Sequence, residues 1–282
     1  SGPDERPSPV AIARTLEEVA RVIREEEPDV LLLQEVDDGG RRTDYEDQLA
    51  RLLPMISDEY RCHASAFYWK ADFVPHARIR GAVGMKLSTI SKYQIGDATR
   101  HQLALIPADR ITQEFSPKRA ILEVRLPVNE GPALVVMNTH LDAFAQGSDT
   151  MQQQVDELSG LLAELTAAGH PWLIGGDFNL LPSPEAYRAL PDHQRVYFNP
   201  QTELADLYER YQAVPSLAET TGPDRERWFT HFPNDPAVSG PDRTIDYILL
   251  ADSLELGNHY VRQHDTLAIA DHFPLVVELR LP

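Results

Sequence analysis

Four short apolar segments of this sequence end at, or carry near one end, a cluster of Asp, Asn, His or Glu residues. Each segment has the length of a strand, and a continuous apolar run of that length is typical of a buried strand. Polar residues at strand ends gather at one edge of a sheet, where α/β and sandwich proteins build active sites. The clusters are Gln34-Glu35, Asn138-Thr139-His140, Asp177-Phe178-Asn179 and Asp271-His272. The chain is therefore expected to bring several strand ends to one rim.

Helices and strands alternate along the chain. Apolar residues recur at helical spacing between Pro9 and Pro28, which predicts an amphipathic helix at 10–25. Further helices are predicted at 45–53 and 151–168, and strands at 29–36, 84–90, 120–126, 133–141, 172–177, 244–251 and 274–281. The region 181–239 holds many prolines, which indicates long surface connections around short helices. This alternation, without a Gly-rich phosphate loop, predicts a layered α/β protein.

Length and composition limit the class of protein. The 282 residues allow one large domain or two small ones, and 42% hydrophobic with 25% charged residues excludes disorder as the main state. Cys62 is the single cysteine, so an internal disulfide and a Cys-based zinc site are excluded.

No apolar run approaches the ~18–20 residues of a membrane span. The opening Ser1-Gly2-Pro3-Asp4 has no signal-peptide features. A soluble monomer is expected, with the cytoplasm favoured as its compartment.

The polar residues at the strand ends indicate a chemistry. The set is rich in carboxylates and free of thiols, which suits a hard divalent ion, Mg²⁺ or Mn²⁺. Histidines beside such an ion neutralise charge on a transferring phosphoryl group, and an ionised Asp orients or deprotonates water. The candidate residues are Glu35, Asn138, His140, Asp177, Asn179, Asp246, Asp271 and His272. Metal-assisted hydrolysis of a phosphoester is the reaction predicted.

Each motif also has a structural interpretation. Gln34-Glu35 alone is most often a surface strand end, and His140 alone is more often a structural histidine. The run 175–179 is more specific, because two glycines let the backbone turn tightly and present Asp177 and Asn179 in one loop. An Asp/Asn turn is the alternative for that run. The order and spacing of all the motifs together favour a functional site.

The ordered motifs resemble those of the endonuclease/exonuclease/phosphatase superfamily, which has the deoxyribonuclease I-like fold. That group includes deoxyribonuclease I, apurinic endonucleases, neutral sphingomyelinases, inositol polyphosphate 5-phosphatases and deadenylases. The matching stretches run from Leu33 to Pro274, nearly the whole chain. They are Leu33-Gln34-Glu35-Val36, Asn138-Thr139-His140-Leu141, Gly175-Gly176-Asp177-Phe178-Asn179, Ile245-Asp246-Tyr247-Ile248 and Ala270-Asp271-His272-Phe273-Pro274.

The resemblance implies a fold and a metal site. The fold is a four-layer α/β sandwich, with two mainly antiparallel sheets packed face to face and helices outside, in a single domain over 1–282. Glu35 would be the principal ligand of Mg²⁺ or Mn²⁺, and Asp271 would lie at the metal site or directly behind it. The partner molecule would be a phosphoester substrate, with nucleic acid among the options.

The resemblance also implies catalytic roles. Asp177 would orient and activate the attacking water. Asn179 and His140 would contact the scissile phosphate, and Asn138 is placed with them as a substrate-binding residue. His272 would stabilise the pentacovalent transition state, held in its tautomer by Asp246, as a carboxylate holds a catalytic histidine elsewhere.

One departure from the superfamily pattern concerns the start of the chain. Members usually open with a strand that carries an Asn for the metal or phosphate, a few residues before the first helix. Here only Ser1 to Pro9 precede that helix, and they include no Asn. Either the sequence begins downstream of that strand, or the metal site lacks the Asn that the strand supplies. Without the strand, one sheet would lose a central element.

Charge bears on the substrate. The balance of 26 basic and 44 acidic residues gives a net charge of −18, which disfavours sequence-blind binding of DNA. Basic pairs such as Arg41-Arg42, Arg78-Arg80 and Lys118-Arg119 are scattered among acids and are interpreted as solvated surface charge. The aromatic pairs Tyr68-Trp69 and Trp228-Phe229 are interpreted mainly as core. The charge therefore favours a phosphodiesterase or phosphatase over a DNA endonuclease or exonuclease. An alternative from another class of function is a catalytically silent protein that binds a ligand or serves as a scaffold.

Overall fold

Six strands form the larger sheet of the structure, in the order β4-β5-β6-β7-β9-β8. Neighbours run antiparallel except β6 and β7, which run parallel. The strands are β4 (Asp97–Gln102), β5 (Ala120–Leu126), β6 (Leu134–His140), β7 (Trp172–Asp177), β8 (Gln212–Val214) and β9 (Asp246–Leu250). The computed structural model describes residues 7–143, 145–233 and 235–281, so Ser1-Gly2-Pro3-Asp4 lies outside the described residues.

The second β-layer is divided into two smaller sheets. One has the order β1-β3-β2 and the other pairs β10 with β11. These strands are β1 (Val30–Asp37), β2 (Cys62–Val74), β3 (Gly81–Ser91), β10 (Glu255–Val261) and β11 (Leu275–Arg280). The expectation of mainly antiparallel sheets is confirmed.

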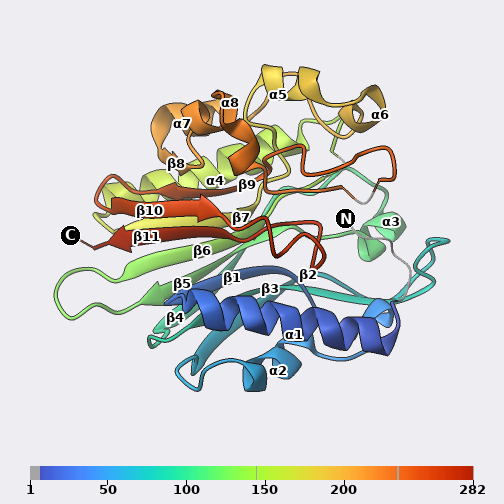
Figure 1. Cartoon of the computed structure of the whole chain (residues 1–282), viewed down its shortest axis with the longest axis horizontal. Helices are drawn as coiled ribbons and strands as arrows, with labels where there is room; N and C mark the ends of the chain where they lie inside the picture. Colours follow the sequence, from blue (N-terminus) through green and yellow to red (C-terminus); the bar gives the residue numbers. More distant parts are fainter. Residues whose placement is uncertain (1–6, 144, 234, 282) are drawn as a thin grey trace.

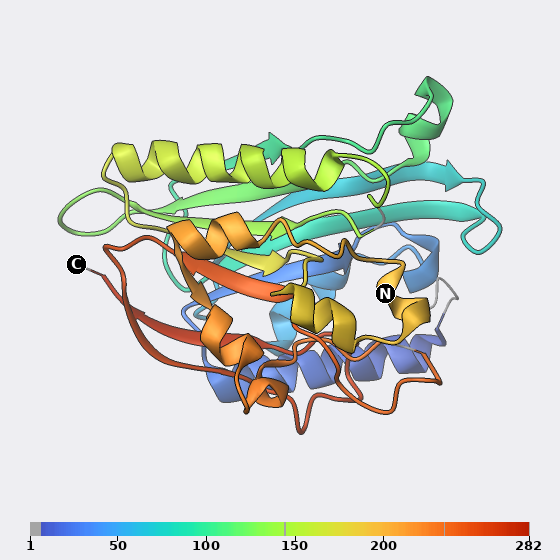
Figure 2. The same ribbon diagram turned by 90° about the horizontal axis from the view of Figure 1, so that it is seen from above.

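Helices cover the outer faces of both β-layers, and the four-layer α/β sandwich is confirmed (Figures 1 and 2). Helix α1 lies on one side of the molecule and α4 on the other. The α-helices are α1 (Pro9–Glu26), α2 (Gln48–Leu52), α3 (Arg110–Phe115), α4 (Thr150–Ala167), α5 (Pro184–Ala189), α6 (Asp192–Arg195), α7 (Ala205–Arg210) and α8 (Leu217–Thr221), with short 3-10 turns η1 (Arg41–Thr43), η2 (Leu53–Met55) and η3 (Arg225–Trp228). None of the described helices is long and apolar enough to cross a membrane.

The hydrophobic core follows these layers. Leu87 of β3 packs against Leu122 and Val136 of the larger sheet, which closes the space between the two β-layers. On the outer faces, Leu158 of α4 packs against Ile174 of β7, and a separate cluster joins α1 and α2 to β1 and β3. Because apolar residues fill each boundary between layers, burial fixes the relative positions of the strands whose ends carry the polar clusters.

The second helix is shorter than the sequence predicts. Helix α2 begins after Asp47, whose carboxylate accepts hydrogen bonds from the backbone N–H groups of Leu49 and Ala50 at 2.9 and 3.3 Å. A side chain that accepts in this way marks a helix start. Tyr45 has a φ of 64°, in the left-handed region, so the predicted helical run at 45–53 is interrupted near its beginning.

Limited proteolysis tests whether the chain folds as one unit. We expect a protease to cut within 181–239, where short helices are joined by long connections, and to release no independently folded half. The reason is that β9, which follows this region in sequence, belongs to the same sheet as β5, β6 and β7, which precede it. The measurement is mass spectrometry of the fragments with thermal unfolding of the cut protein. Two separate unfolding transitions would contradict a single domain.

Candidate active site

The pairing of three strands brings three of the predicted site residues to one rim. His140 is paired with Asp177 across β6 and β7, and Asp177 is paired with Asp246 across β7 and β9. β6 and β7 run parallel, so both reach this rim at their carboxyl ends. The sequence prediction that separate strand ends converge is confirmed for these strands.

His272 joins the rim just before β11 begins. Its Nδ1 lies 2.9 Å from Asp246 Oδ2 and 3.1 Å from Asp246 Oδ1, so the predicted contact between the two residues is present. Thr230 Oγ1 accepts a hydrogen bond from the Asp246 backbone N–H at 3.1 Å, which fixes the start of β9. Burial alone would lower the pKa of His272, but the carboxylates of Asp246 and Asp177 outweigh it and raise the pKa to about 10. The ring is therefore a charged imidazolium at neutral pH.

Asp177 lies at the centre of the polar network. Its Oδ2 is 3.3 Å from His140 Nε2 and 3.7 Å from His272 Nε2. Its Oδ1 accepts a 2.8 Å hydrogen bond from the Asn179 backbone N–H, and the Asn179 side-chain amide donates to Oδ2 at 3.2 Å. Burial raises the pKa of Asp177 to about 7, in spite of the nearby His272 charge. A carboxylate with a pKa near neutrality can accept a proton from water.

His140 has the opposite electrostatic setting to His272. It is 4% exposed, and burial together with the positive charge of Arg119 holds its pKa well below the usual range. Its ring also lies 5.3 Å from the ring of Tyr68. His140 is therefore neutral at physiological pH, and one ring nitrogen can donate while the other accepts.

Glu35 is delivered to the rim by an irregularity in β1. The register with β3 shifts between Leu33 and Val36, and Glu35 itself has a φ of 54°, in the left-handed region. A bulge of this kind re-aims a side chain, and strained backbone at such a point is common at functional sites. The Glu35 side chain is 38% exposed, and Arg42 donates to its Oε2 at 3.1 Å.

The charge of Glu35 is stabilised by its neighbours. Burial would raise its pKa, but the positive charge of the Arg42 guanidinium outweighs this and lowers the pKa to about 2. Glu35 is therefore ionised at neutral pH, and Arg42 is hydrogen-bonded to one of its two oxygens. An exposed, ionised oxygen is the ligand type that a hard cation requires, so this residue fits the expected Mg²⁺ or Mn²⁺.

Asn138 does not lie where a substrate can reach it, and this corrects the sequence prediction. Its side chain is fully buried, and its amide donates to the backbone carbonyls of Leu33 and Ser88 at 3.0 and 3.1 Å. Gln34 donates to Asn138 Oδ1 at 2.7 Å. Asn138 therefore ties β6 to β1 and β3, and it holds the Gln34-Glu35 segment against the rim.

The two glycines before Asp177 are required by close packing. Gly176 has a φ of 148°, and a Cβ added there would lie 2.0 Å from the Thr139 carbonyl oxygen. A Cβ at Gly175 would lie 2.9 Å from the Leu32 side chain. The glycines thus let β7 approach both β6 and β1, in agreement with the expectation that they shape this loop.

Several residues around the rim were not predicted from the sequence. Arg119, interpreted as surface charge, is 7% exposed, and its guanidinium lies 5.0 Å from the Tyr68 ring. It directly precedes β5, the antiparallel neighbour of β6, so a basic residue at that strand start was the available signal. His231 and Arg42 were also missed. Tyr68 is core as interpreted, at 2% exposed.

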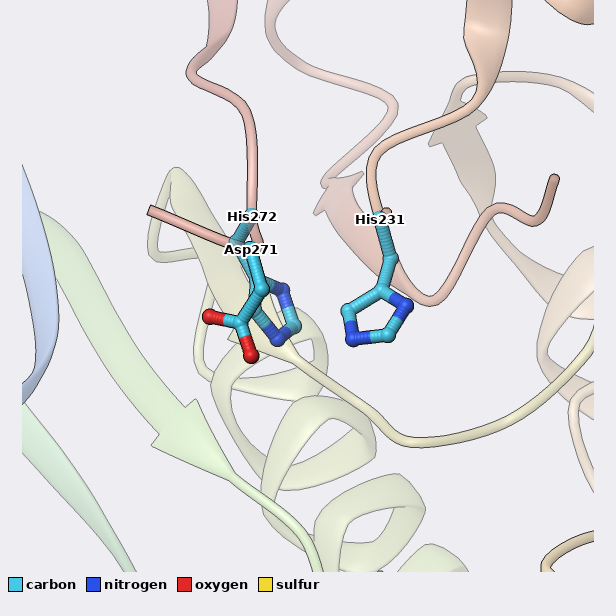
Figure 3. Close-up of side chains that lie close together, drawn as sticks. All are labelled: His231, Asp271 and His272. Atoms are coloured by element: carbon cyan, nitrogen blue, oxygen red, sulfur yellow. The ribbon is translucent and has the colours of Figure 1, made fainter. Parts of the chain in front are cut away.

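Asp271 lies beside His231 and His272, and the three side chains are close together (Figure 3). Each offers a potential ligand atom to a metal ion, and Asp177, Asp246 and His272 form a second such group. Asp271 is half-buried. The sequence expectation for Asp271, at or directly behind a metal site, is compatible with this position.

The family model described as "Endonuclease/Exonuclease/phosphatase family" matches residues 6–268 of the sequence. The chain belongs to this family. Its members include nucleases, phosphatases and phosphodiesterases, which are typically hydrolases of phosphoesters. The match includes the segments that carry Glu35, His140, Asp177 and Asp246. Asp271 and His272 lie beyond its last residue.

Solved structures of the family share the fold at low sequence identity. An endonuclease/exonuclease/phosphatase from Beutenbergia cavernae is 22% identical with a TM-score of 0.66, over 94% of this chain and 66% of that one, so the chain spans about two thirds of that protein. The human nocturnin catalytic domain with bound sulfate is 17% identical with a TM-score of 0.57, and the match covers 96% of this chain and 87% of that one. A mannosyl-6-phosphatase from Bacteroides thetaiotaomicron is 14% identical with a TM-score of 0.57, and the match covers 96% of this chain and 92% of that one. Among curated proteins, no match is found.

Proposed function

We propose that the protein is a Mg²⁺- or Mn²⁺-dependent hydrolase of a phosphoester, acting by attack of an activated water. The observation that supports this most is the continuous set of contacts from Asp246 through His272 to Asp177 and on to His140. It combines a carboxylate of near-neutral pKa with one charged and one neutral imidazole. Such a combination can take a proton from water and stabilise charge on a phosphoryl group at the same time.

The proposed mechanism assigns one role to each side chain. Asp177 orients the attacking water and accepts its proton. Asn179, held beside Asp177, and the neutral His140 donate hydrogen bonds to the phosphate oxygens. The imidazolium of His272 stabilises the negative charge that develops in the transition state. Glu35 would hold the metal ion, whose chemistry is to neutralise phosphate charge as a Lewis acid.

A small pocket next to Glu35 supports a compact anionic substrate. It has a volume of about 180 Å³, and its lining includes Arg41, Arg42, Arg78 and the half-buried Trp69. Asp37 also lines the pocket and accepts a hydrogen bond from Arg42 at 2.6 Å, so Arg41 and Arg78 are the guanidinium groups that remain to attract a phosphate or carboxylate in a chain whose net charge is −18. A substrate with a second anionic group near the scissile phosphate is therefore favoured over a long DNA duplex.

A phosphoester panel tests the proposal. Bis-p-nitrophenyl phosphate, sugar phosphates, inositol phosphates, sphingomyelin, abasic DNA and single-stranded nucleic acid are incubated with Mg²⁺ or Mn²⁺, with and without EDTA. We expect chelator-sensitive turnover, highest on a small substrate. Preferred cleavage of abasic or single-stranded DNA would favour the nuclease alternative. No metal-dependent turnover of any substrate would favour a silent binding protein.

The pH dependence of kcat/KM follows from two of the pKa shifts. Asp177 acts as an ionised base, so activity should rise as the pH passes the Asp177 pKa of about 7. His272 acts in its charged form, so activity should fall as the pH passes its pKa of about 10. Asp246→Asn removes the carboxylate that raises the pKa of His272 and should move the alkaline limb to lower pH. An alkaline limb that stays in place in this variant would contradict the assignment.

A further inference from the structure

His231 is a buried histidine without a role in the proposed hydrolysis. It is 6% exposed, and its Nδ1 has no hydrogen-bond partner among the described residues. The backbone N–H of Phe232 donates to the Asp271 carbonyl at 2.8 Å, and that of Phe273 donates to the Thr230 carbonyl at 2.8 Å. These bonds flank His231 and His272, which are paired antiparallel. In such a pair, the side chains that face each other lie closest.

The backbone pairing brings three potential metal ligands together. The rings of His231 and His272 have centroids 4.6 Å apart at an angle of 71°. One ligand atom from each of His231, Asp271 and His272 lies within 4.8 Å of the other two. Figure 3 shows the three side chains gathered from two neighbouring chain segments. Ligands of a tetrahedral ion with bonds of ~2.0–2.2 Å are ~3.3–3.6 Å apart, so small side-chain rotations suffice to close this site.

The ligand types differ from those at Glu35. Two imidazoles and one carboxylate suit a borderline cation such as Zn²⁺, whereas Mg²⁺ prefers oxygen ligands alone. His272 is also oriented as metal-binding histidines are, because Asp246 lies 2.9 Å from its Nδ1. Nε2, which lies 3.7 Å from Asp177 Oδ2, is then the ring nitrogen available to a metal. The group of His231, Asp271 and His272 therefore differs in metal preference from the candidate site at Glu35.

We propose that His231, Asp271 and His272 form a binding site for Zn²⁺ or a similar transition-metal ion, and that its occupation inhibits the enzyme. The inhibitory part rests on the proposed function, in which Nε2 of His272 is the atom that faces the phosphoryl group. A metal ion bound at Nε2 occupies that atom, and any proton on it leaves to solvent. His272 can therefore stabilise the phosphoryl group or bind the metal, and each state excludes the other.

Isothermal titration calorimetry tests the site without reference to activity. ZnCl₂ is titrated into the full chain with Mg²⁺ present, for the wild type, His231→Gln and the control His63→Gln, which removes an exposed histidine on β2. We expect a Zn²⁺ affinity ~100-fold lower in His231→Gln, because loss of a ligand costs at least as much as loss of a residue that orients one. The control should bind as the wild type does. Equal affinity in His231→Gln and the wild type, or no Zn²⁺ binding by the wild type, would overturn the site.

Two further measurements complete the test. In the wild type, imidazole ¹⁵N spectra should show two of the ten histidines shifting at one equivalent of Zn²⁺, which requires no variant to fold. In the phosphoester assay, the rate of each variant is expressed relative to its own rate without Zn²⁺. The Zn²⁺ concentration that halves this relative rate should be higher for His231→Gln than for the wild type, by the same factor as the Zn²⁺ dissociation constant. Zn²⁺ bound at these histidines with no loss of rate would overturn the inhibition. Absence of any turnover would instead refute the proposed function, while calorimetry would still decide the site.

Discussion

Replacing Glu35 with Gln is expected to lower the Mg²⁺-dependent rate of hydrolysis by ~10³-fold or more. A metal ion contributes several kcal/mol to the stabilisation of transition-state charge, and each ~1.4 kcal/mol is a tenfold change in rate. Gln has nearly the same size as Glu but lacks the anionic oxygen that a hard cation needs. The pKa of Glu35, lowered to about 2, means that the wild-type residue supplies this charge throughout the neutral range.

The control for this variant separates the metal from Arg42. Arg42 donates to Glu35 at 3.1 Å and to Asp37 at 2.6 Å, so Glu35→Gln weakens an ion pair as well as the candidate metal site. Asp37 is 1% exposed, so its carboxylate is covered by protein, whereas the Glu35 side chain is 38% exposed. Asp37→Asn should therefore keep the wild-type Mg²⁺ half-saturation, whereas Glu35→Gln should raise it strongly. The measurement is the initial rate against Mg²⁺ concentration, and an unchanged Mg²⁺ curve for Glu35→Gln would disprove its assignment as ligand.

The strands that carry the motifs could be predicted because burial leaves a signal in the sequence. β1 and β7 lie within the layers and contain apolar runs followed by polar residues, and β9 is an apolar run that begins at Asp246. β4 (Asp97–Gln102) was missed, because it is an edge strand, mostly exposed, and held by backbone pairing with β5. β2 and β10 were missed for a related reason, since exposed and partly buried residues are mixed along them. Hydrogen bonding between strands has no side-chain pattern of its own.

The site could be predicted as far as its residues stand in linear motifs. Asp177 and Asn179 share one loop, so their proximity is a local property of the sequence. His231 lies in a proline-rich region and reaches His272 through backbone pairing between distant segments, which no local pattern encodes. Asn138 shows the opposite error, because a motif identifies a residue without saying which side of the strand it faces. Only the packing of β6 against β1 and β3 shows that its amide points inward.

Asp246 and His272 are expected to act as one unit, so that the effects of removing them are strongly non-additive. In serine proteases, loss of the carboxylate that orients the catalytic histidine costs ~10⁴-fold in kcat. We expect His272→Ala to cost ~10³–10⁴-fold and Asp246→Asn ~10²–10³-fold, by analogy with such units. Once the imidazole is gone, Asp246 has no ring to orient or charge to stabilise. The double variant should therefore be no slower than His272→Ala.

The geometry gives this expectation a sharp control. His101 and Glu123 form another histidine–carboxylate pair, with His101 Nε2 2.9 Å from Glu123 Oε2, on β4 and β5. His101→Ala removes an imidazole from a pair of the same type and should leave turnover close to that of the wild type. Turnover is measured at saturating Mg²⁺ for Asp246→Asn, His272→Ala, the double variant and His101→Ala. If the losses for Asp246→Asn and His272→Ala multiply in the double variant, the two residues work independently, and the 2.9 Å contact between them has a structural role alone.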